Sequence, residues 1–331
     1  MTILKAELHT HLEGTLSPTT ALTLAKRNKV NLPMERISKN QEGYVFSDFL
    51  DFIHTYDTVV SAVIKSPLDY YDVTFDYLKR NAQEGAIYIE MMYSPELAEA
   101  NTHIPSIEHL KAIQDAINDA EHQFKIVGRI LITAIRHFGE EAARKVAQKA
   151  LQETLPCVVG FGLAGDEINY PPEWFTKAFE IANEGGLACT IHAGEFGTAE
   201  SMQTAMQTLP IKRIGHGVQA IHNRETIAML KDKDITLEIC PSSNVVLGLY
   251  PRLNLHPLPK LMEKGIKTCI NSDDPPFFKS ELFQEYQSVQ DTFKFTDEVM
   301  LSFTRQAIEA AFVDKATKAK LLDKLETLIV V

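Results

Sequence analysis

Two histidines separated by one residue lie near the start of the chain, at the end of an apolar run. His9 and His11 belong to the segment Glu-Leu-His-Thr-His-Leu-Glu-Gly, residues 7–14. If the run is a β-strand, residues two apart point to the same side, so both imidazoles face one way. Imidazole nitrogen is a good ligand for zinc. The pair therefore predicts half of a zinc site, whose other ligands must come from later in the chain.

Further ionisable residues follow apolar runs later in the chain. His192 and Glu195 lie in the segment His-Ala-Gly-Glu, His216 lies between two glycines, and Asp273 and Asp274 precede two prolines. Each feature alone could be a buried core histidine or a solvated turn. Together, three imidazoles and a carboxylate match the nitrogen and oxygen ligands that zinc accepts. Adjacent carboxylates repel each other, so we expect one of the two acids to bind the cation and the other to bind a ligand.

Eight short β-rich runs alternate with amphipathic helical stretches, and several are apolar almost throughout, as parallel strands covered on both faces are. The runs are Ile3–His9, Ala86–Tyr93, Ile126–Ile135, Val158–Leu163, Leu187–His192, Arg213–His216, Thr236–Cys240 and Lys267–Asn271. This count predicts an α/β fold, a (β/α)8 TIM-like barrel, whose strand ends would gather the polar residues on one face. A doubly wound open sheet is the alternative, but no Gly-x-Gly-x-x-Gly segment follows the first run.

The chain is predicted to be a single domain over residues 1–331, because no Gly/Ser/Pro-rich linker and no internal repeat divides it. Residues 17–84 form an unusually long segment between the first two runs, and Ser17-Pro18 predicts a helix start there. A second amphipathic stretch contains Phe46, Phe49, Leu50 and Ile53. An insertion after the first strand lies on the active-site face, so it could be a helical lid, or its aromatic residues could only pack in the core. Helices are also predicted within residues 296–331.

Composition narrows the class of protein. The chain has 331 residues, 45% of them hydrophobic, and a formal net charge of −11, which argues against nucleic-acid binding. Its four cysteines form no close pair and predict buried thiols in a reducing compartment. No charged-then-apolar leader and no apolar run of 18 residues is present, so we expect a cytoplasmic enzyme without a membrane segment. No sequence feature indicates an oligomeric state.

Six segments, in order, resemble motifs of the adenosine deaminase family of metal-dependent hydrolases, which includes adenosine, AMP and adenine deaminases. They are residues 8–14, 163–167, 192–195, 213–217, 239–244 and 272–275. The resemblance implies a barrel with one zinc ion per chain. The implied ligands are His9, His11, His192 and Asp273. Zinc would lower the pKa of a bound water toward neutrality.

The resemblance also implies roles for the remaining residues. Glu195 would protonate the purine N1, and His216 would orient the attacking water and help to deprotonate it. Asp274, the third catalytic residue, would hydrogen-bond N7, and the backbone N–H of Gly165 would donate to N3. The implied substrate-binding residues are His11, Glu13, Gly165 and Asp274. The other histidines are interpreted as surface or packing residues, of which His137 and His256 are the most open to another role.

The expected reaction is deamination of adenosine and 2′-deoxyadenosine to inosine and 2′-deoxyinosine plus ammonia, in purine salvage. Animal-type members of the family carry Asp where Glu13 stands, and that Asp meets the ribose 5′-hydroxyl, whereas adenine-specific relatives carry Glu. The alternatives are therefore an adenine deaminase, which produces hypoxanthine, or a deaminase of another 6-aminopurine nucleoside. A second departure is Gly162, where many relatives have Asp.

Other classes of protein fit less well. The cytidine-deaminase type of zinc site needs Pro-Cys-x-x-Cys, and Pro156-Cys157 has no second cysteine. Two-metal members of the wider amidohydrolase group typically have a bridging lysine at the fourth strand, where this chain has Leu-Ala-Gly-Asp-Glu. A non-catalytic purine-binding barrel would be expected to have lost the acid or a metal ligand, and the chain retains them all.

Overall fold

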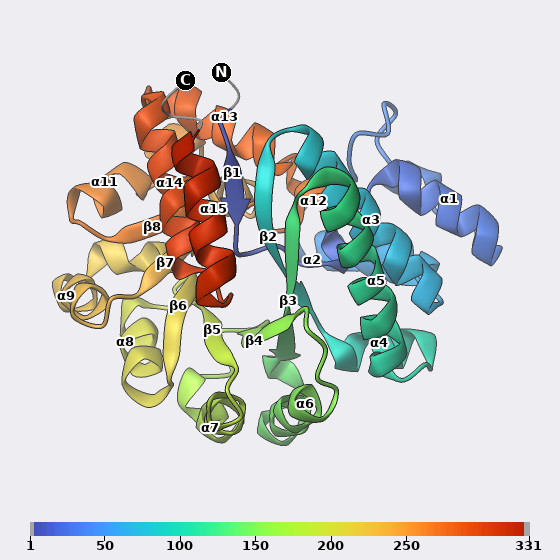
Figure 1. Ribbon diagram of the computed structural model, residues 1–331, viewed down its shortest axis with the longest axis horizontal. Helices are drawn as coiled ribbons and strands as arrows, with labels where there is room; N and C mark the ends of the chain where they lie inside the picture. The colour runs from blue at the N-terminus through green and yellow to red at the C-terminus, as the bar shows by residue number, and fades with distance from the viewer. Residues whose placement is uncertain (1–2, 328–331) are drawn as a thin grey trace.

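Eight parallel strands follow one another around a barrel in the order of the sequence, with helices between them (Figure 1). In the computed structural model, which describes residues 3–327, the strands are β1 (Lys5–Glu7), β2 (Ala86–Tyr93), β3 (Val127–Ile135), β4 (Val158–Ala164), β5 (Ala188–Ala193), β6 (Ile211–His216), β7 (Thr236–Ile239) and β8 (Lys267–Ile270). The barrel closes just beyond β1 and β8, where Thr10 pairs in parallel with Asp273. The fold is the (β/α)8 barrel that the sequence predicts.

The predicted strands differ from the observed ones mainly at their ends. β2 has the predicted bounds, and β4 continues one residue further, to Ala164. β1 is shorter than predicted, because beyond Glu7 the chain makes only isolated bridges, from Thr10 to Asp273 and from His11 to Met92. The histidine pair therefore lies just past the strand, in a segment held by both neighbouring strands.

Helices lie between the strands and around the barrel (Figure 1). They are α1 (Pro18–Asn28), α2 (Phe49–Thr55), α3 (Pro67–Gln83), α4 (Pro95–Thr102), α5 (Ser106–Phe124), α6 (Glu140–Gln152), α7 (Thr176–Glu184), α8 (Ala199–Thr208), α9 (Arg224–Asp232), α10 (Pro241–Val246), α11 (Leu258–Glu263), α12 (Pro275–Phe278), α13 (Leu282–Phe293), α14 (Asp297–Ala310) and α15 (Lys315–Thr327). Local sequence fixes several starts. Ser17 caps α1 by accepting a hydrogen bond from the Thr20 N–H, and Pro18 occupies the first helical position, as predicted.

An ionic network lies inside the barrel among the apolar core residues. Arg213 on β6 is 1% exposed and contacts Glu90 on β2 over 2.5 Å and Glu238 on β7 over 2.6 Å. Its guanidinium group also lies 3.5 Å from the centre of the Phe312 ring. Buried charges are costly unless they are paired, so this network specifies how β2, β6 and β7 face one another. The four cysteines are buried and free, as predicted.

The long segment after β1 contains α1, α2, a π-helical turn over Tyr56–Ser61, and α3. Its aromatic side chains pack against the segment that follows β8. The Phe52 and Phe277 rings lie 5.0 Å apart, and the Tyr56 ring stacks on Phe277 at 5.7 Å. Leu50 is exposed, and the side chain of Phe49 lies outside what the structure describes. The segment thus contacts the chain next to Asp274, and its action as a lid stays a prediction.

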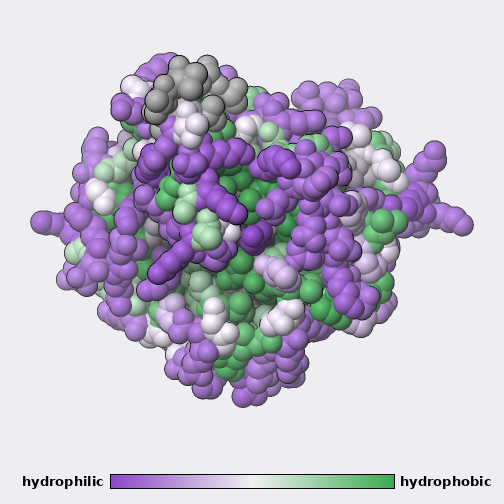
Figure 2. Space-filling view, viewed as in Figure 1, coloured by the Kyte–Doolittle hydropathy of each residue, from purple (hydrophilic) through white to green (hydrophobic). Residues whose placement is uncertain are grey.

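The C-terminal helices α14 and α15 pack against each other, and α14 also contacts β1 and β8. They fulfil the helix prediction up to Thr327, whereas residues 328–331 lie outside the described part. Hydrophilic residues cover most of the face seen in Figure 2, and apolar side chains show mainly near its middle. Between residues 3 and 327, no helix combines the length and apolar character needed to cross a membrane.

Candidate metal centre and active site

The two ends of the barrel closure carry three of the four predicted metal ligands, which are His9, His11 and Asp273. His9 and His11 flank Thr10, whose hydroxyl donates to the Asp273 carbonyl over 2.9 Å. The backbone N–H of Asp273 donates to the His9 carbonyl, and that of His11 donates to the Asp273 carbonyl. Residues more than 260 positions apart are thereby held side by side. The closure of the barrel and the assembly of the site depend on the same hydrogen bonds.

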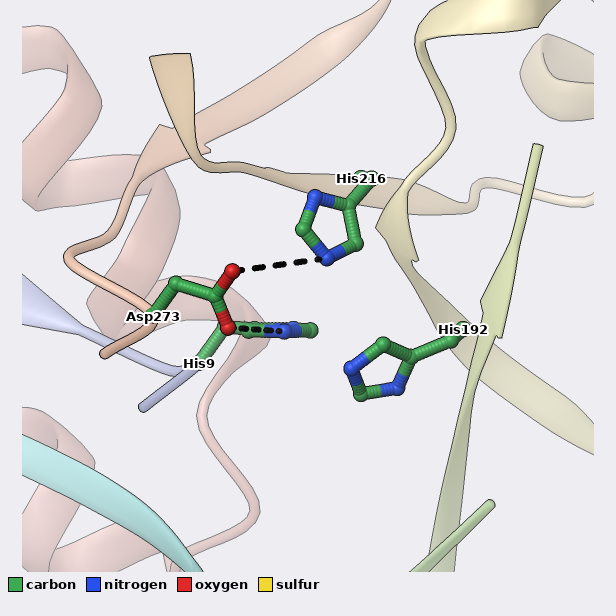
Figure 3. Close-up of side chains that lie close together, drawn as sticks. All are labelled: His9, His192, His216 and Asp273. Carbon is green, nitrogen blue, oxygen red and sulfur yellow. Dashed lines mark ion pairs between the residues drawn. The ribbon is translucent and has the colours of Figure 1, made fainter. Parts of the chain in front are cut away.

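Four buried side chains from four strand ends meet at one point (Figure 3). Ligand atoms of His9, His192, His216 and Asp273 all lie within 4.8 Å of one another. One carboxylate oxygen of Asp273 lies 3.6 Å from Nε2 of His9, and the other lies 4.0 Å from Nε2 of His216. Nε2 of His11 lies 3.3 Å from Asp273 Oδ1. His11, Asp273 and Asp274 form a second group of side chains that could hold a metal ion.

The chemistry of these donors fits a zinc ion. The Nε2 atoms of His9 and His192 are buried and have no hydrogen-bond partner among the described residues, which is costly unless a cation accepts their lone pairs. Nδ1 of His9 is occupied by Glu238, as is usual for the second nitrogen of a metal-binding histidine. The imidazole rings of His11 and His9 lie close to the Asp273 carboxylate, and their effect outweighs that of burial and holds the pKa of Asp273 well below its usual range. The carboxylate is therefore available as an anionic ligand.

The structure brings all four predicted ligands together, but it also brings His216 to the same carboxylate. The His9 ring centre lies 5.7 Å from that of His11, 4.4 Å from that of His192 and 4.8 Å from that of His216. Five side chains thus surround a space that a four-coordinate ion would fill with four ligands. The assignment of His11 as the ligand and His216 as the catalytic residue stays a prediction.

Unusual backbone geometry positions two of these side chains. His216 has φ of +58° and Asp273 has φ of +63°, a region that residues other than glycine rarely adopt. Two glycines let other groups approach. A Cβ at Gly14 would lie 1.7 Å from Asp274 Oδ1, and a Cβ at Gly215 would lie 2.6 Å from His9 Cε1. Glycine is therefore needed at positions 14 and 215, because Asp274 and His9 pack too closely there to leave room for a side chain.

Glu195 lies on a turn immediately after β5, as predicted. Its Oε1 atom is buried without a hydrogen-bond partner among the described residues and lies 3.6 Å from Nδ1 of His216. Burial and the nearby charge of Asp273 raise the pKa of Glu195 well above its ordinary value. A carboxyl group in this state keeps its proton near neutrality, which is what a general acid needs.

The turn that carries Glu195 is anchored by a second buried acid. Glu167 accepts hydrogen bonds from the backbone N–H groups of Gly194, over 2.7 Å, and Glu195, over 3.2 Å. Gly194 has φ of +72°, which permits the sharp turn after the strand.

Asp274 also has a raised pKa, about 7, because it is buried and lies near Asp273, although His11 opposes the shift.

The predicted substrate-binding residues follow the ends of β1, β4 and β8. Glu13 follows His11 in a short 3-10 turn, and its Oε1 accepts a hydrogen bond from the Tyr70 hydroxyl over 3.1 Å. Desolvation raises the pKa of Glu13 to about 7. Gly165 follows β4 with φ of +100°, and a Cβ there would lie 3.2 Å from Nδ1 of His137. A larger residue at position 165 would therefore be both strained and crowded.

Several residues of the site had no role predicted from the sequence, although His256 was noted as open to another role. They are the supporting residues Glu90, Glu167, Arg213, Glu238, Asn244 and His256. One signal was available, because Glu90, Arg213 and Glu238 are charged residues inside runs read as buried strands. Such residues need partners, but only the fold shows which ones.

The chain is similar to known proteins over almost its whole length. The model of a family described as adenosine deaminase matches residues 4–328. An adenine deaminase of Chelativorans sp. (strain BNC1) is 39% identical over 327 residues, covering 99% of each chain. The crystal structure of an adenine deaminase from Arthrobacter aurescens superposes with a TM-score of 0.92 at 30% identity, covering 99% of each chain. An amidohydrolase from Burkholderia ambifaria, crystallised with bound zinc, has a TM-score of 0.86 at 26% identity and covers 99% of this chain and 92% of its own.

Proposed function

Because this chain belongs to the adenosine deaminase family of metal-dependent hydrolases, we propose that it is a zinc-dependent adenine deaminase. The reaction would consume adenine and water and release hypoxanthine and ammonia. The observation that carries the choice of substrate is the full-length similarity to proteins named adenine deaminase, at 39% and 30% identity. The main expectation from sequence was adenosine, and these relatives favour its alternative.

Glu13 supports the same choice from within the chain. Its carboxyl group is half-buried beside the metal cluster, and the Tyr70 hydroxyl occupies its Oε1. Each carboxylate oxygen has two lone pairs, so the group can accept a further hydrogen bond from a ligand. Free adenine offers an N–H group in its five-membered ring, at the position where adenosine carries ribose. A carboxylate that accepts from this N–H would favour the free base, because a nucleoside would leave it without a donor.

The proposed ligands of the zinc ion are His9, His11, His192 and Asp273. Bound zinc would supply a Lewis acid that makes water nucleophilic at neutral pH. Glu195, whose pKa is raised, would donate a proton to N1 of the purine, which makes C6 a better electrophile. Asp274 would hydrogen-bond N7, and the Gly165 N–H would donate to N3. His216 would hold the attacking water beside C6.

The test is a comparison of kcat/KM for adenine, adenosine and 2′-deoxyadenosine, with the metal content measured on the same sample. We expect adenine to be preferred by at least about 100-fold, because a site that hydrogen-bonds a specific substrate group discriminates strongly against an analogue that lacks it. Glu195→Gln should abolish turnover while zinc content stays near one per chain. A preference for adenosine would overturn the choice of substrate, and an active protein without metal would overturn the mechanism.

Glu13→Asp provides a matched test of specificity, since it keeps the charge and shortens the side chain by one methylene. We expect this variant to lose most of its activity on adenine and to change much less, relative to wild type, on adenosine. Equal losses of activity on both substrates would show that Glu13 does not determine the preference for the base over the nucleoside.

A further inference from the structure

A chain of hydrogen bonds leads away from His216 on the side opposite to Asp273. Nδ1 of His216 lies 3.2 Å from Nδ2 of Asn244, and Oδ1 of Asn244 lies 3.1 Å from Nε2 of His256. The chain ends at the backbone N–H of Leu258, which donates to Nδ1 of His256 over 3.2 Å. All three side chains are almost completely buried. No part of the proposed chemistry uses Asn244 or His256.

The backbone end of this chain sets the direction of every bond in it. The N–H of Leu258 can only donate, so Nδ1 of His256 must carry a lone pair. Burial lowers the pKa of His256 to about 3, and a neutral imidazole with a bare Nδ1 carries its hydrogen on Nε2. Nε2 of His256 therefore donates to Asn244, which must present its oxygen there.

The same logic passes through Asn244 to the active site. Because the oxygen of Asn244 faces His256, its amide N–H2 group faces Nδ1 of His216 and donates to it. The reverse orientation of the amide would leave His256 without a hydrogen on either nitrogen, which is not an accessible state of imidazole. Nδ1 of His216 is thus an acceptor, and the hydrogen of the neutral ring lies on Nε2. That nitrogen is the one that faces Asp273 Oδ2.

We propose that Asn244 and His256 are positioning residues that fix His216 in the tautomer with hydrogen on Nε2. His216 then donates a hydrogen bond to the reacting water oxygen and does not take a proton from it. This role rests on the proposed function and changes one element of the sequence-based expectation, in which His216 helps to deprotonate the water. The N–H donor of His216 stabilises negative charge on the attacking oxygen. It also holds that oxygen in position for attack on C6.

The surrounding structure keeps the chain of bonds rigid. The N–H of Asn244 donates to the Cys240 carbonyl over 3.1 Å, and the Asn244 carbonyl accepts from Leu249 and Tyr250. The Tyr250 ring packs edge-on against His256 with centres 5.0 Å apart. His256 has a hydrogen bond at each ring nitrogen, so its ring cannot turn over without breaking both.

The direct test is nitrogen-15 NMR of the zinc-loaded protein with labelled histidine, because chemical shifts and long-range proton couplings distinguish the two tautomers. We expect His216 and His256 of the wild type both to show a protonated Nε2 and a bare Nδ1. The measurement needs no substrate, so its result stands whether adenine or adenosine is the substrate. A His216 signal with the hydrogen on Nδ1 would overturn the proposal.

Asn244→Asp provides the matched perturbation, since a carboxylate of the same shape can only accept. We expect His216 to move its hydrogen to Nδ1 and kcat on the preferred purine to fall on the order of 100-fold, with KM and zinc content nearly unchanged. His256→Gln should keep most of the activity, because its amide can still donate to Asn244. Ser243→Ala, on the same helix, is the control and should leave both the NMR signature and kcat unchanged.

Two outcomes of the variants would contradict the proposal. One is an Asn244→Asp protein that keeps the wild-type tautomer, and the other is one that changes tautomer but keeps wild-type kcat. If Asn244→Asp does not fold, the wild-type spectrum and the His256→Gln variant still decide the matter. A wild-type spectrum as expected, with no deamination of any purine, would refute the proposed function alone.

Discussion

Nδ1 of His9 lies 2.8 Å from Oε2 of Glu238, and both side chains are completely buried inside the barrel. Glu238 is held in turn by Arg213 and by the Thr190 hydroxyl, so the orientation of His9 depends on contacts that reach β2 and β5. This carboxylate directs Nε2 of His9 toward the cluster and makes it a stronger electron donor. Such outer contacts typically change metal affinity by 10- to 100-fold.

We therefore expect Glu238→Gln to weaken zinc binding by about 10- to 100-fold. The amide can still accept from His9, but it lacks the charge that strengthens the imidazole as a ligand. Arg213 keeps its ion pair with Glu90, so the barrel should still form. Competition with a chelator of known affinity measures the effect, and Glu225→Gln at an exposed position is the control. Equal zinc affinity in the two variants would show that the contact is only structural.

A second prediction concerns the anchor of the catalytic turn. In Glu167→Gln, the one remaining oxygen can accept from Gly194 or from Glu195, and the new N–H2 group faces the other N–H. We expect kcat to fall at least about tenfold, because small displacements of a reacting group are costly. Zinc content should not change, since Glu167 contacts none of the predicted ligands' side chains. The exposed Glu173→Gln is the control, and a Glu167→Gln enzyme as active as that control would contradict this role.

Two glycine substitutions should separate catalysis from metal binding. In Gly14→Ala the new methyl group would overlap Oδ1 of Asp274, so we expect turnover to be lost while zinc is retained. In Gly215→Ala the methyl group would displace His9, so we expect weaker zinc binding as well. Metal analysis and steady-state kinetics on both proteins check the pair. The prediction is wrong if the two variants lose zinc to the same extent.

The sequence predicted the strands well because their signal is local. Runs such as residues 86–93 are apolar and bounded by turns, and β2 has those bounds. The end of β1 could not be predicted, because the bridge between Thr10 and Asp273 depends on where a segment more than 260 residues away lies. The convergence of His9, His192 and Asp273 followed from the barrel alone, since residues at the ends of parallel strands share one face.

The supporting residues were harder to find for a physical reason. Asn244 lies in a segment that the family resemblance singled out, but nothing local indicates that its side chain joins His216 to His256. The direction of the hydrogen bonds in that chain is set by the backbone N–H of Leu258, and only the fold places this N–H beside His256. A charged residue in a buried strand, such as Glu238, must have an oppositely charged or polar partner, but the sequence does not show which residue that is. Sequence thus indicates the reacting groups, and the fold identifies what orients them.

The last prediction concerns His109, a buried residue of α5 far from the metal cluster in sequence. Its Nδ1 lies 2.9 Å from the Tyr93 hydroxyl and its Nε2 lies 3.1 Å from the Thr102 hydroxyl. Burial lowers the pKa of His109 to about 4, below the ordinary value of 6.5. Between these two pH values the unfolded chain binds more protons at this site than the folded chain does. Stability must therefore rise with pH across this window.

The contribution of His109 to stability is complete above pH 6.5 and is lost as the pH falls toward 4. Its slope can approach about 1.4 kcal/mol per pH unit, the value for one proton. We expect His109→Asn, which cannot be protonated, to show a smaller decrease in the free energy of unfolding between pH 6.5 and 4. Urea titrations at several pH values, with zinc held in excess, measure this difference. Gln123→Asn, at an exposed position of the same helix, should keep the wild-type slope. Parallel curves for His109→Asn and the wild type would show that His109 contributes nothing to the pH dependence.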